Sequence, residues 1–247
     1  MNFVMAPSDT TDVLVAAGIL ALAHVFVTEM RRVPDRIRDT LLMAGAGVSL
    51  TYVLLHILPR LADKQQDLLA TTETGLLGFM QNHAYNMALI GMVVMFGVSR
   101  MAAKGSSRQT MPALVTTVVA YSAYNVLIGY LIVHRLRVEF FTLILITVAM
   151  FTYLFVSDYG LRRKWSEAYD RWVRWVLAVS VLVGGILGVS TDISGNTIAL
   201  WFSFLAGVMI MDTIREKLPR EAPGTFKAFL AGVLGYCLLI VAFRLSA

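Results

Sequence analysis

Ionisable side chains inside long apolar stretches are the residues of this chain with the clearest capacity for chemistry. One set comprises His24, Asp158 and Asp212, with Glu29 and Glu216 close to the ends of their stretches. Such side chains are costly in a membrane and usually face a partner or a water-filled cavity. An imidazole together with carboxylates can hold a divalent cation or relay protons. The alternative is that Glu29 and Glu216 lie at the interface and form ion pairs with adjacent arginines.

Imidazole and amide groups form a second set at the opposite ends of the apolar stretches. His56 ends one stretch, Asn82 and His83 begin the next, and His134 ends a later one. Two or three imidazoles near one mouth of a helical bundle could capture a soft divalent cation at neutral pH. The alternative is that each histidine is an interfacial residue with a single hydrogen bond.

Tyrosines and one asparagine lie near the middle of the apolar stretches, where contact with lipid would be unfavourable. We expect them to face inward and to hydrogen-bond with one another, either closing the middle of the bundle or lining a path through it. These residues are Tyr52, Tyr121, Tyr124, Asn125, Tyr130 and Tyr153.

The elements that position these groups are membrane-spanning helices. The 247-residue chain is 57% hydrophobic and only 15% charged, with a mean hydropathy of +0.70, whereas soluble domains carry about 25% charged residues. Runs of roughly 20 apolar residues without strand-like alternation predict helices rather than a barrel. The expected fold class is all-α, a membrane bundle of eight transmembrane helices over residues 11–30, 40–60, 79–102, 110–134, 139–158, 172–190, 196–214 and 226–245.

Basic residues concentrate in alternate connections between the predicted spans. Residues 31–38, 100–108, 162–174 and 215–227 hold most of the 21 lysines and arginines. The positive-inside rule therefore places these connections in the cytoplasm and both termini outside. The partner implied by such patches is anionic membrane lipid, and no nucleic-acid partner is expected. The composition and the absence of eukaryotic-type sorting signals suggest a multi-pass protein of the bacterial cytoplasmic (inner) membrane.

Two local patterns lie between the fifth and sixth predicted spans and within the sixth. Residues 162–171 have apolar side chains at helical spacing among arginines, which predicts a helix along the inner membrane surface. Trp165, Trp172 and Trp175 are expected in an interfacial aromatic belt. Gly184 and Gly188 give the sixth span a small-residue face suited to close helix packing or to dimerisation.

A sequence that occurs twice indicates that the protein has two related halves. Residues 46–60 read AGVSLTYVLLHILPR, and residues 206–220 read AGVMIMDTIREKLPR. The copies lie 160 positions apart in the second and seventh predicted spans, to which the charge pattern gives opposite directions. We predict a single transmembrane domain over residues 1–247, with inverted repeats of spans 1–3 (residues 11–102) and spans 6–8 (residues 172–245) around two central spans (residues 110–158).

This plan of three, two and three spans resembles that of the ZIP family of divalent metal transporters, and short motifs agree with it. Residues 52–59, which include His56, are similar to the end of the second ZIP span. Residues 204–219, which include Asp212, resemble the seventh ZIP span with its Ala-Gly start, acidic residue and Leu-Pro end. Residues 124–129 resemble the fourth span, where the family has His-Asn, two residues, an acid and Gly.

The resemblance implies a metal site between the fourth and fifth spans, but this chain departs from the family there. Tyr124 stands where the family has His and Ile128 where it has an acid, so that only Asn125 matches. Residues 148–153 of the fifth span offer no strong ligand at the same depth. One asparagine does not replace the water shell of a divalent cation. The candidate metal residues are therefore Asn125, Asp158, Asp212, Glu216, His24, His56 and His83.

Two functions fit these observations. The first is a ZIP-like integral membrane transporter of a divalent metal cation, zinc or similar, that works through an altered site. The metal is then the substrate, and no resident cofactor is firmly implied. The second is a transport-inactive accessory or scaffold subunit that binds another membrane protein, or forms a homodimer, through a lipid-facing surface such as the Gly184–Gly188 face. The chain has no catalytic constellation, so we do not expect an enzyme.

Overall fold

The protein is helical throughout the part that its structure describes. A computed structural model describes residues 10–69, 83–108, 110–135, 140–191, 193–217 and 225–246, and these contain no strand, which confirms the all-α prediction for them. The 3₁₀ helix η1 and the π-helical turns η2, η3 and η4 interrupt the α-helices. The elements are α1 (Thr10–Phe26), η1 (Val27–Arg32), α2 (Asp35–Tyr52), η2 (Val53–Ile57), α3 (Leu58–Leu69), α5 (Ala84–Arg108), α6 (Met111–Arg135), α7 (Phe140–Lys164), α8 (Ser166–Ala168), η3 (Tyr169–Val173), α9 (Arg174–Ser190), α10 (Gly195–Asp212), η4 (Thr213–Lys217) and α11 (Thr225–Ser246).

Seven of the described helical runs are long and apolar enough to cross a membrane. They follow the first seven predicted spans in order, and the run that starts at Asp35 continues through η2 into α3 as far as Gln66. Helix α11 contributes a shorter apolar run, Phe226–Ala242. The structure therefore supports a multi-pass membrane protein, and the eighth span stays a prediction.

The outer surface of the bundle is apolar, as expected of a protein surrounded by lipid. Large hydrophobic side chains are more than half exposed on several helices, among them Leu89, Val119, Ile186 and Leu238. A water-soluble monomer rarely presents such residues over many helices. The core contains small residues of α1 and α10 and fully buried tyrosines of α2 and α7.

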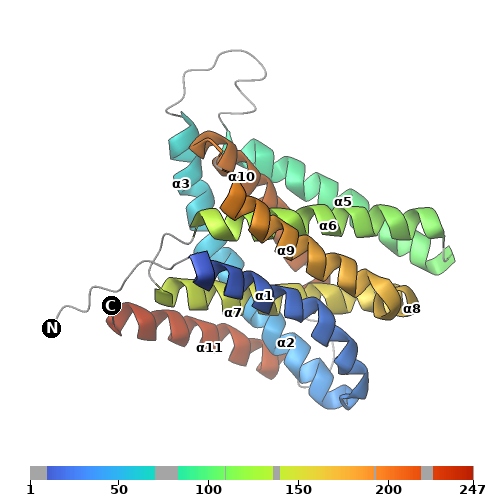
Figure 1. Ribbon diagram of the computed structural model, residues 1–247. Helices are drawn as coiled ribbons and strands as arrows, with labels where there is room; N and C mark the ends of the chain where they lie inside the picture. Colours follow the sequence, from blue (N-terminus) through green and yellow to red (C-terminus); the bar gives the residue numbers. More distant parts are fainter. Residues whose placement is uncertain are drawn as a thin grey trace.

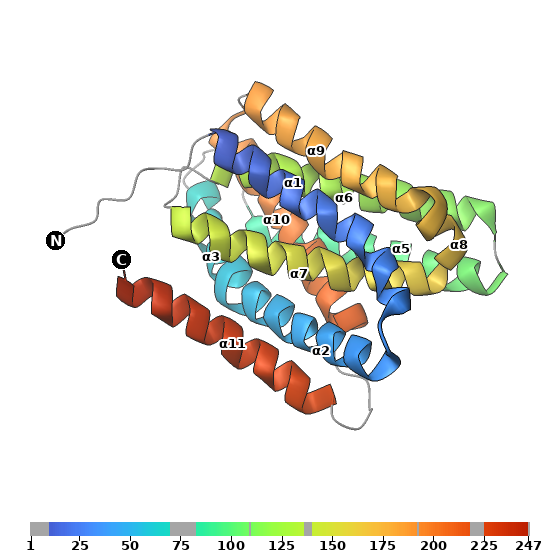
Figure 2. The ribbon, with the colours of Figure 1, turned by 60° about the horizontal axis from the view of Figure 1, so that its bottom comes forward.

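Close contacts between backbones fix how α2 packs on α11. A β-carbon at Gly47 would overlap the carbonyl oxygen of Phe229, and one at Gly232 would overlap the carbonyl oxygen of Ala44. Each glycine therefore lets the other helix approach as closely as backbone atoms allow. Figures 1 and 2 both show α11 running alongside α2 at one side of the bundle.

The same arrangement recurs where α5 crosses α10. Gly91 lies against the carbonyl oxygen of Phe204, and Gly207 lies against the carbonyl oxygen of Ala88. In both crossings, each glycine faces the residue three positions before the glycine of the other helix. The two glycines that the repeated sequence places 160 positions apart, Gly47 and Gly207, therefore perform the same packing role in different helix pairs.

Helices α6 and α9 form a third crossing of this kind. Gly129 lies against the Val181 carbonyl oxygen, and Gly184 lies against the backbone of Val126. Gly188 also packs on α6, at Tyr130 and Val133. The Gly184–Gly188 face is thus used inside the chain, which corrects the expectation that it faces lipid and is available to a partner.

Candidate functional site

Seven of the polar side chains with almost no exposed surface are an imidazole, two carboxylates, an amide and three phenols, and we call these seven the polar core. They come from α1, α6, α7, η3 and α10. Polar groups in a membrane interior are costly unless they are paired, so such a concentration marks the region where function is to be sought. The residues of the polar core are His24, Tyr124, Asn125, Tyr153, Asp158, Tyr169 and Asp212.

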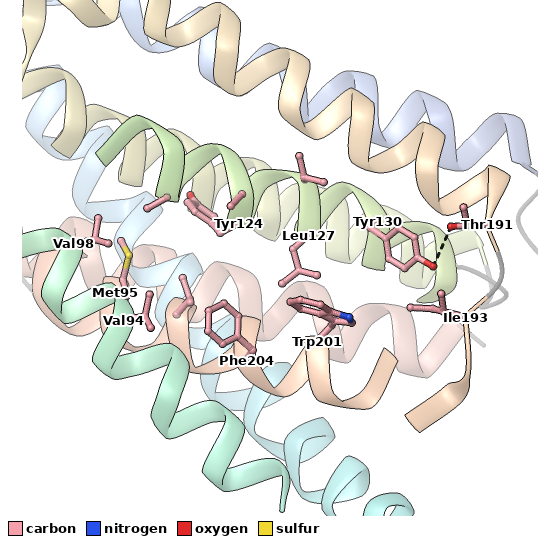
Figure 3. Close-up of a pocket in the computed structure, with 14 residues that line it drawn as sticks. Val94, Met95, Val98, Tyr124, Leu127, Tyr130, Thr191, Ile193, Trp201 and Phe204 are labelled. Atoms are coloured by element: carbon pink, nitrogen blue, oxygen red, sulfur yellow. Dashed lines mark hydrogen bonds between the residues drawn. The ribbon is translucent and has the colours of Figure 1, made fainter. Parts of the chain in front are cut away.

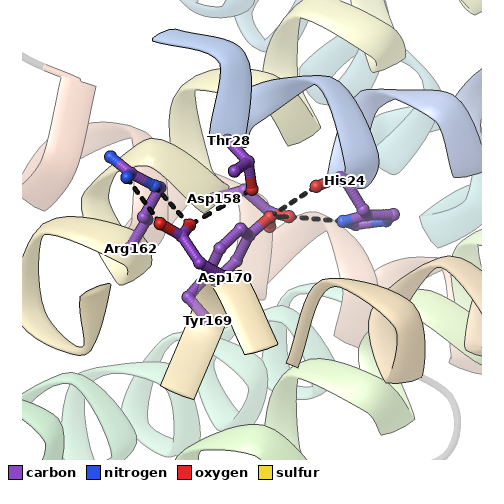
Figure 4. Close-up of polar contacts among 6 residues, drawn as sticks. All are labelled: His24, Thr28, Asp158, Arg162, Tyr169 and Asp170. Carbon is purple, nitrogen blue, oxygen red and sulfur yellow. Dashed lines mark hydrogen bonds and ion pairs between the residues drawn. The ribbon is translucent and has the colours of Figure 1, made fainter. Parts of the chain in front are cut away.

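The centre of the polar core is a direct contact between His24 of α1 and Asp158 of α7. His24 Nδ1 lies 2.5 Å from Asp158 Oδ2, and both side chains are completely buried. The Tyr169 hydroxyl also donates to Asp158 Oδ2, and it lies 2.9 Å from the backbone carbonyl oxygen of His24. Figure 4 shows the three side chains converging from three segments of the chain. One buried carboxylate therefore joins α1, α7 and η3.

Tyr169 reaches this carboxylate because the chain reverses between α7 and α9. Trp165 leaves the helical conformation, with φ −138° and ψ 51°, and the π-helical turn η3 follows. A π turn inserts one extra residue and so changes the direction in which the following side chains point. The reversal brings the start of the next helical run back against the end of α7 (Figure 2).

The predicted surface helix over residues 162–171 is corrected by this reversal. Trp165 and Tyr169 are buried in the core rather than placed at a membrane surface, and only Trp175 of the predicted tryptophan belt is more than half exposed. The arginines of this segment are typical of an interfacial helix, but Arg162 pairs with Asp170, and both side chains are largely buried.

A second polar layer lies one helical turn from the first, nearer the arginine-rich end of the bundle. Arg162 forms two hydrogen bonds with Asp170, Nε to Oδ1 at 2.6 Å and Nη2 to Oδ2 at 2.7 Å. Thr28 donates to Asp170 Oδ1 at 3.2 Å. The side chains of Arg162 and Asp170 are 14% and 24% exposed, whereas those of His24 and Asp158 are completely buried, so this neighbouring layer is the one that reaches the surface (Figure 4). Paired hydrogen bonds between guanidinium and carboxylate fix geometry as well as adding energy.

The remaining members of the polar core are Tyr124 and Asn125 of α6, Tyr153 of α7 and Asp212 of α10. The Asp212 carboxylate interacts electrostatically with Tyr124 and Tyr153, and Tyr124 also interacts electrostatically with Asp158. Asn125 is fully buried, and both polar atoms of its amide have no hydrogen-bond partner among the described residues. Buried amides are nearly always hydrogen-bonded, so Asn125 is a position where a water molecule or an ion would be stabilised.

The structure brings only some of the candidate metal residues together. His24 and Asp158 are in contact, and Asp212 and Asp158 both interact electrostatically with Tyr124. His56 is in η2, where it stacks on Tyr52 with ring centres 5.4 Å apart. The other candidates are His83, which is half-buried just before α5, and Glu216, whose side chain lies outside the described residues.

No preassembled metal centre exists among the described residues, because no three His, Cys, Asp or Glu side chains come close enough to share an ion. The alternative expected for Glu29, an ion pair with a neighbouring arginine, is confirmed: Glu29 pairs with Arg32 at the surface. Sequence reasoning did not identify Thr28, Arg162, Tyr169 and Asp170 as parts of the site. The sequence signal that could have indicated the Arg162–Asp170 pair was the carboxylate of Asp170 close to several arginines.

A cavity of about 620 Å³ opens between α5, α6 and α10. Its lining is apolar, with residues such as Met95, Leu127 and Phe204, and it contains no carboxylate, imidazole, ammonium or guanidinium group. Figure 3 shows Tyr124 at one end and the Tyr130–Thr191 hydrogen bond, 3.3 Å long, at the other. Such a lining suits hydrocarbon and offers no ligand to a metal ion, so the polar core and not this cavity is the candidate site.

Comparison with known proteins does not assign this chain to a family. No protein-family model matches it, and no curated protein does. The function must therefore be argued from the polar core itself.

Proposed function

We propose that the protein is a ZIP-like integral membrane transporter of a divalent metal cation, such as zinc, whose path passes the polar core. The observation that carries the proposal is Asp158, a completely buried carboxylate whose partners are an imidazole and a phenol. A structural role would be served at lower cost by apolar residues, since burying a carboxylate in a low-dielectric interior requires compensation. Ionisable groups retained in membrane interiors typically line ion and proton paths.

The recurrence of one packing pattern supports a fold made of inverted repeats. Gly47 and Gly207 lie 160 positions apart and each packs on a carbonyl oxygen of another helix. The π-helical turns that end α2 and α10 start at Val53 and Thr213 and have the same separation. Inverted repeats are typical of transporters, in which the site lies between the repeats. We retain the eight spans, the bacterial inner membrane and the external termini as parts of this proposal.

The second candidate is a transport-inactive accessory subunit of the same fold. It is favoured by the complete burial of Tyr153 and the near-complete burial of Tyr52 in the middle of the bundle. This function would need a partner surface other than Gly184–Gly188, because α6 covers that face.

Flux measurements on purified protein in liposomes separate the two functions. The wild-type protein, Asp212→Asn or Glu167→Gln is reconstituted into the membranes of vesicles that contain a zinc-sensitive dye, and Zn²⁺ is added outside. We expect wild-type flux above that of empty vesicles, with a decrease of about tenfold or more in Asp212→Asn because a carboxylate of the path is lost. Glu167 is exposed and pairs with Arg171 at the surface, so Glu167→Gln should transport normally.

The accessory function makes the opposite forecast for the same vesicles. A folded wild-type protein that transports no more Zn²⁺, Mn²⁺, Cd²⁺ or Fe²⁺ than empty vesicles would contradict the transporter proposal. Equal flux in wild type and Asp212→Asn would show that transport does not pass this part of the polar core.

A further inference from the structure

One atom at the centre of the polar core is not used by the hydrogen bonds around it. His24 contacts Asp158 through Nδ1, whereas Nε2 is buried and has no hydrogen-bond partner among the described residues. Figure 4 shows Nδ1 facing Asp158 and the rest of the ring directed away from the other five labelled residues. A buried ring nitrogen without a partner is costly, so an arrangement that keeps it requires an explanation.

The surroundings of His24 are those of a metal-binding histidine. An imidazole that binds a metal through one nitrogen usually donates the proton of the other to a carboxylate, which fixes the tautomer and the ring orientation. Asp158 is placed to accept that proton from Nδ1, which leaves the lone pair of Nε2 free for a cation. Asp158 is itself held by the Tyr169 hydroxyl, as the carboxylate of such a unit is usually held by a further hydrogen bond.

We propose that His24 Nε2 binds the cation in transit and that Asp158 acts as the residue that orients the imidazole. The inference rests on the proposed function, since it takes the transported cation to be its ligand. Imidazole nitrogen selects borderline divalent ions such as Zn²⁺ and Co²⁺ over Mg²⁺ and Ca²⁺, which prefer oxygen. Because no three strong ligands converge among the described residues, the imidazole would be the one strong protein ligand, and the ion would keep water molecules as its other ligands while it passes. Loose binding of this kind allows an ion to leave as well as to enter.

The variant that tests the proposal is His24→Asn. An asparagine amide N–H can take the place of Nδ1 and keep the hydrogen bond to Asp158, but it has no group at the position of Nε2. The substitution therefore removes the proposed ligand and preserves the contact between α1 and α7. Asp158→Asn tests the orienting role, and Glu167→Gln is the control because Glu167 is exposed and pairs with Arg171 at the surface.

Co²⁺ binding to the full-length protein in detergent gives the readout, through its visible absorption and through competition by Zn²⁺. We expect one Co²⁺ site that is lost in His24→Asn, weakened about 10- to 100-fold in Asp158→Asn, and unchanged in Glu167→Gln. Thermal unfolding of each variant without metal confirms that the comparison is between folded proteins.

Four outcomes separate the binding proposal from its alternatives. Undiminished Co²⁺ binding in a folded His24→Asn would overturn it, as would wild-type protein that binds no Co²⁺ or Zn²⁺ at millimolar concentration, since Nε2 would then contact only water. Loss of binding in Glu167→Gln would also contradict it, because a surface residue would then hold the ion. A protein that binds Co²⁺ through His24 and carries no flux in liposomes would leave the binding proposal standing and reject the transporter function.

Discussion

At the scale of single residues, the Tyr169 hydroxyl is the group of the polar core whose loss should be most clearly measurable. It donates to the Asp158 carboxylate and also contacts the His24 carbonyl oxygen in a region closed to solvent. Tyr169→Phe removes the hydroxyl and keeps the ring, so that a buried carboxylate loses a donor. We expect the free energy of unfolding to fall by about 1.5–3 kcal/mol, the usual value for a hydrogen bond to a charged group. Denaturant unfolding in detergent, followed by tryptophan fluorescence, measures the change.

Tyr159→Phe is the matched control for that measurement. Tyr159 is also near the end of α7, but it is half-buried, and its ring faces the Arg38 guanidinium at 5.9 Å. Its hydroxyl does not bind Asp158, so we expect a change within about 0.5 kcal/mol. Equal losses in the two variants would mean that hydroxyls near this end of the bundle matter for a reason unrelated to Asp158. The sequence identified His24 and Asp158 as ionisable residues in apolar stretches. It could not predict their contact, because the two positions are 134 residues apart. It also did not identify Tyr169 as a partner, because the segment around Tyr169 has the pattern of a surface helix.

At the scale of helices, the glycines of the two equivalent crossings should have equal importance. A β-carbon at Gly47 or Gly207 meets a backbone carbonyl oxygen, which cannot move without displacing its helix. Gly47→Ala and Gly207→Ala should each destabilise the protein by about 1–3 kcal/mol, as overpacking of a close contact does. Gly18→Ala is the control, because nothing lies within 4 Å of the added β-carbon and alanine favours the helix by up to about 1 kcal/mol. Thermal unfolding of the three variants in one detergent gives the comparison.

A destabilised Gly207→Ala beside an unaffected Gly47→Ala would contradict the equivalence of the two crossings. The sequence predicted the first seven apolar helices and the small-residue face at Gly184 and Gly188 correctly, because both depend on composition and spacing within one segment. It could not predict which helix covers that face. The partner, α6, is chosen by the fit of Gly129 against α9, and such a fit depends on both surfaces at once.

At the scale of the whole molecule, composition was sufficient to predict a helical membrane bundle. A chain with 15% charged residues cannot cover a soluble globule with polar surface, and its apolar runs have the length of membrane helices. The assembly of the polar core was not predictable in the same way. The candidate residues lie on several helices, and the rotation of each helix about its axis decides whether a carboxylate contacts another carboxylate or a tyrosine. Helices α1 and α10 are apolar on most faces, so their sequence patterns hardly constrain this rotation.

The position of the C-terminus relative to the membrane decides whether the molecule has the symmetry required of two inverted halves. Eight spans place both termini on the same side, whereas the seven long apolar runs without a crossing by α11 would place them on opposite sides. We expect alkaline phosphatase fused after Ala247 to be active and a fluorescent protein fused there to be dark, because this end would lie outside the cytoplasm. The same fusions made in the connection at Lys104 should give the reverse result, since this connection is rich in basic residues. A fluorescent C-terminal fusion would mean that α11 does not cross the membrane. The third span of the first repeat would then have no equivalent span in the second repeat, which would contradict the inverted repeats.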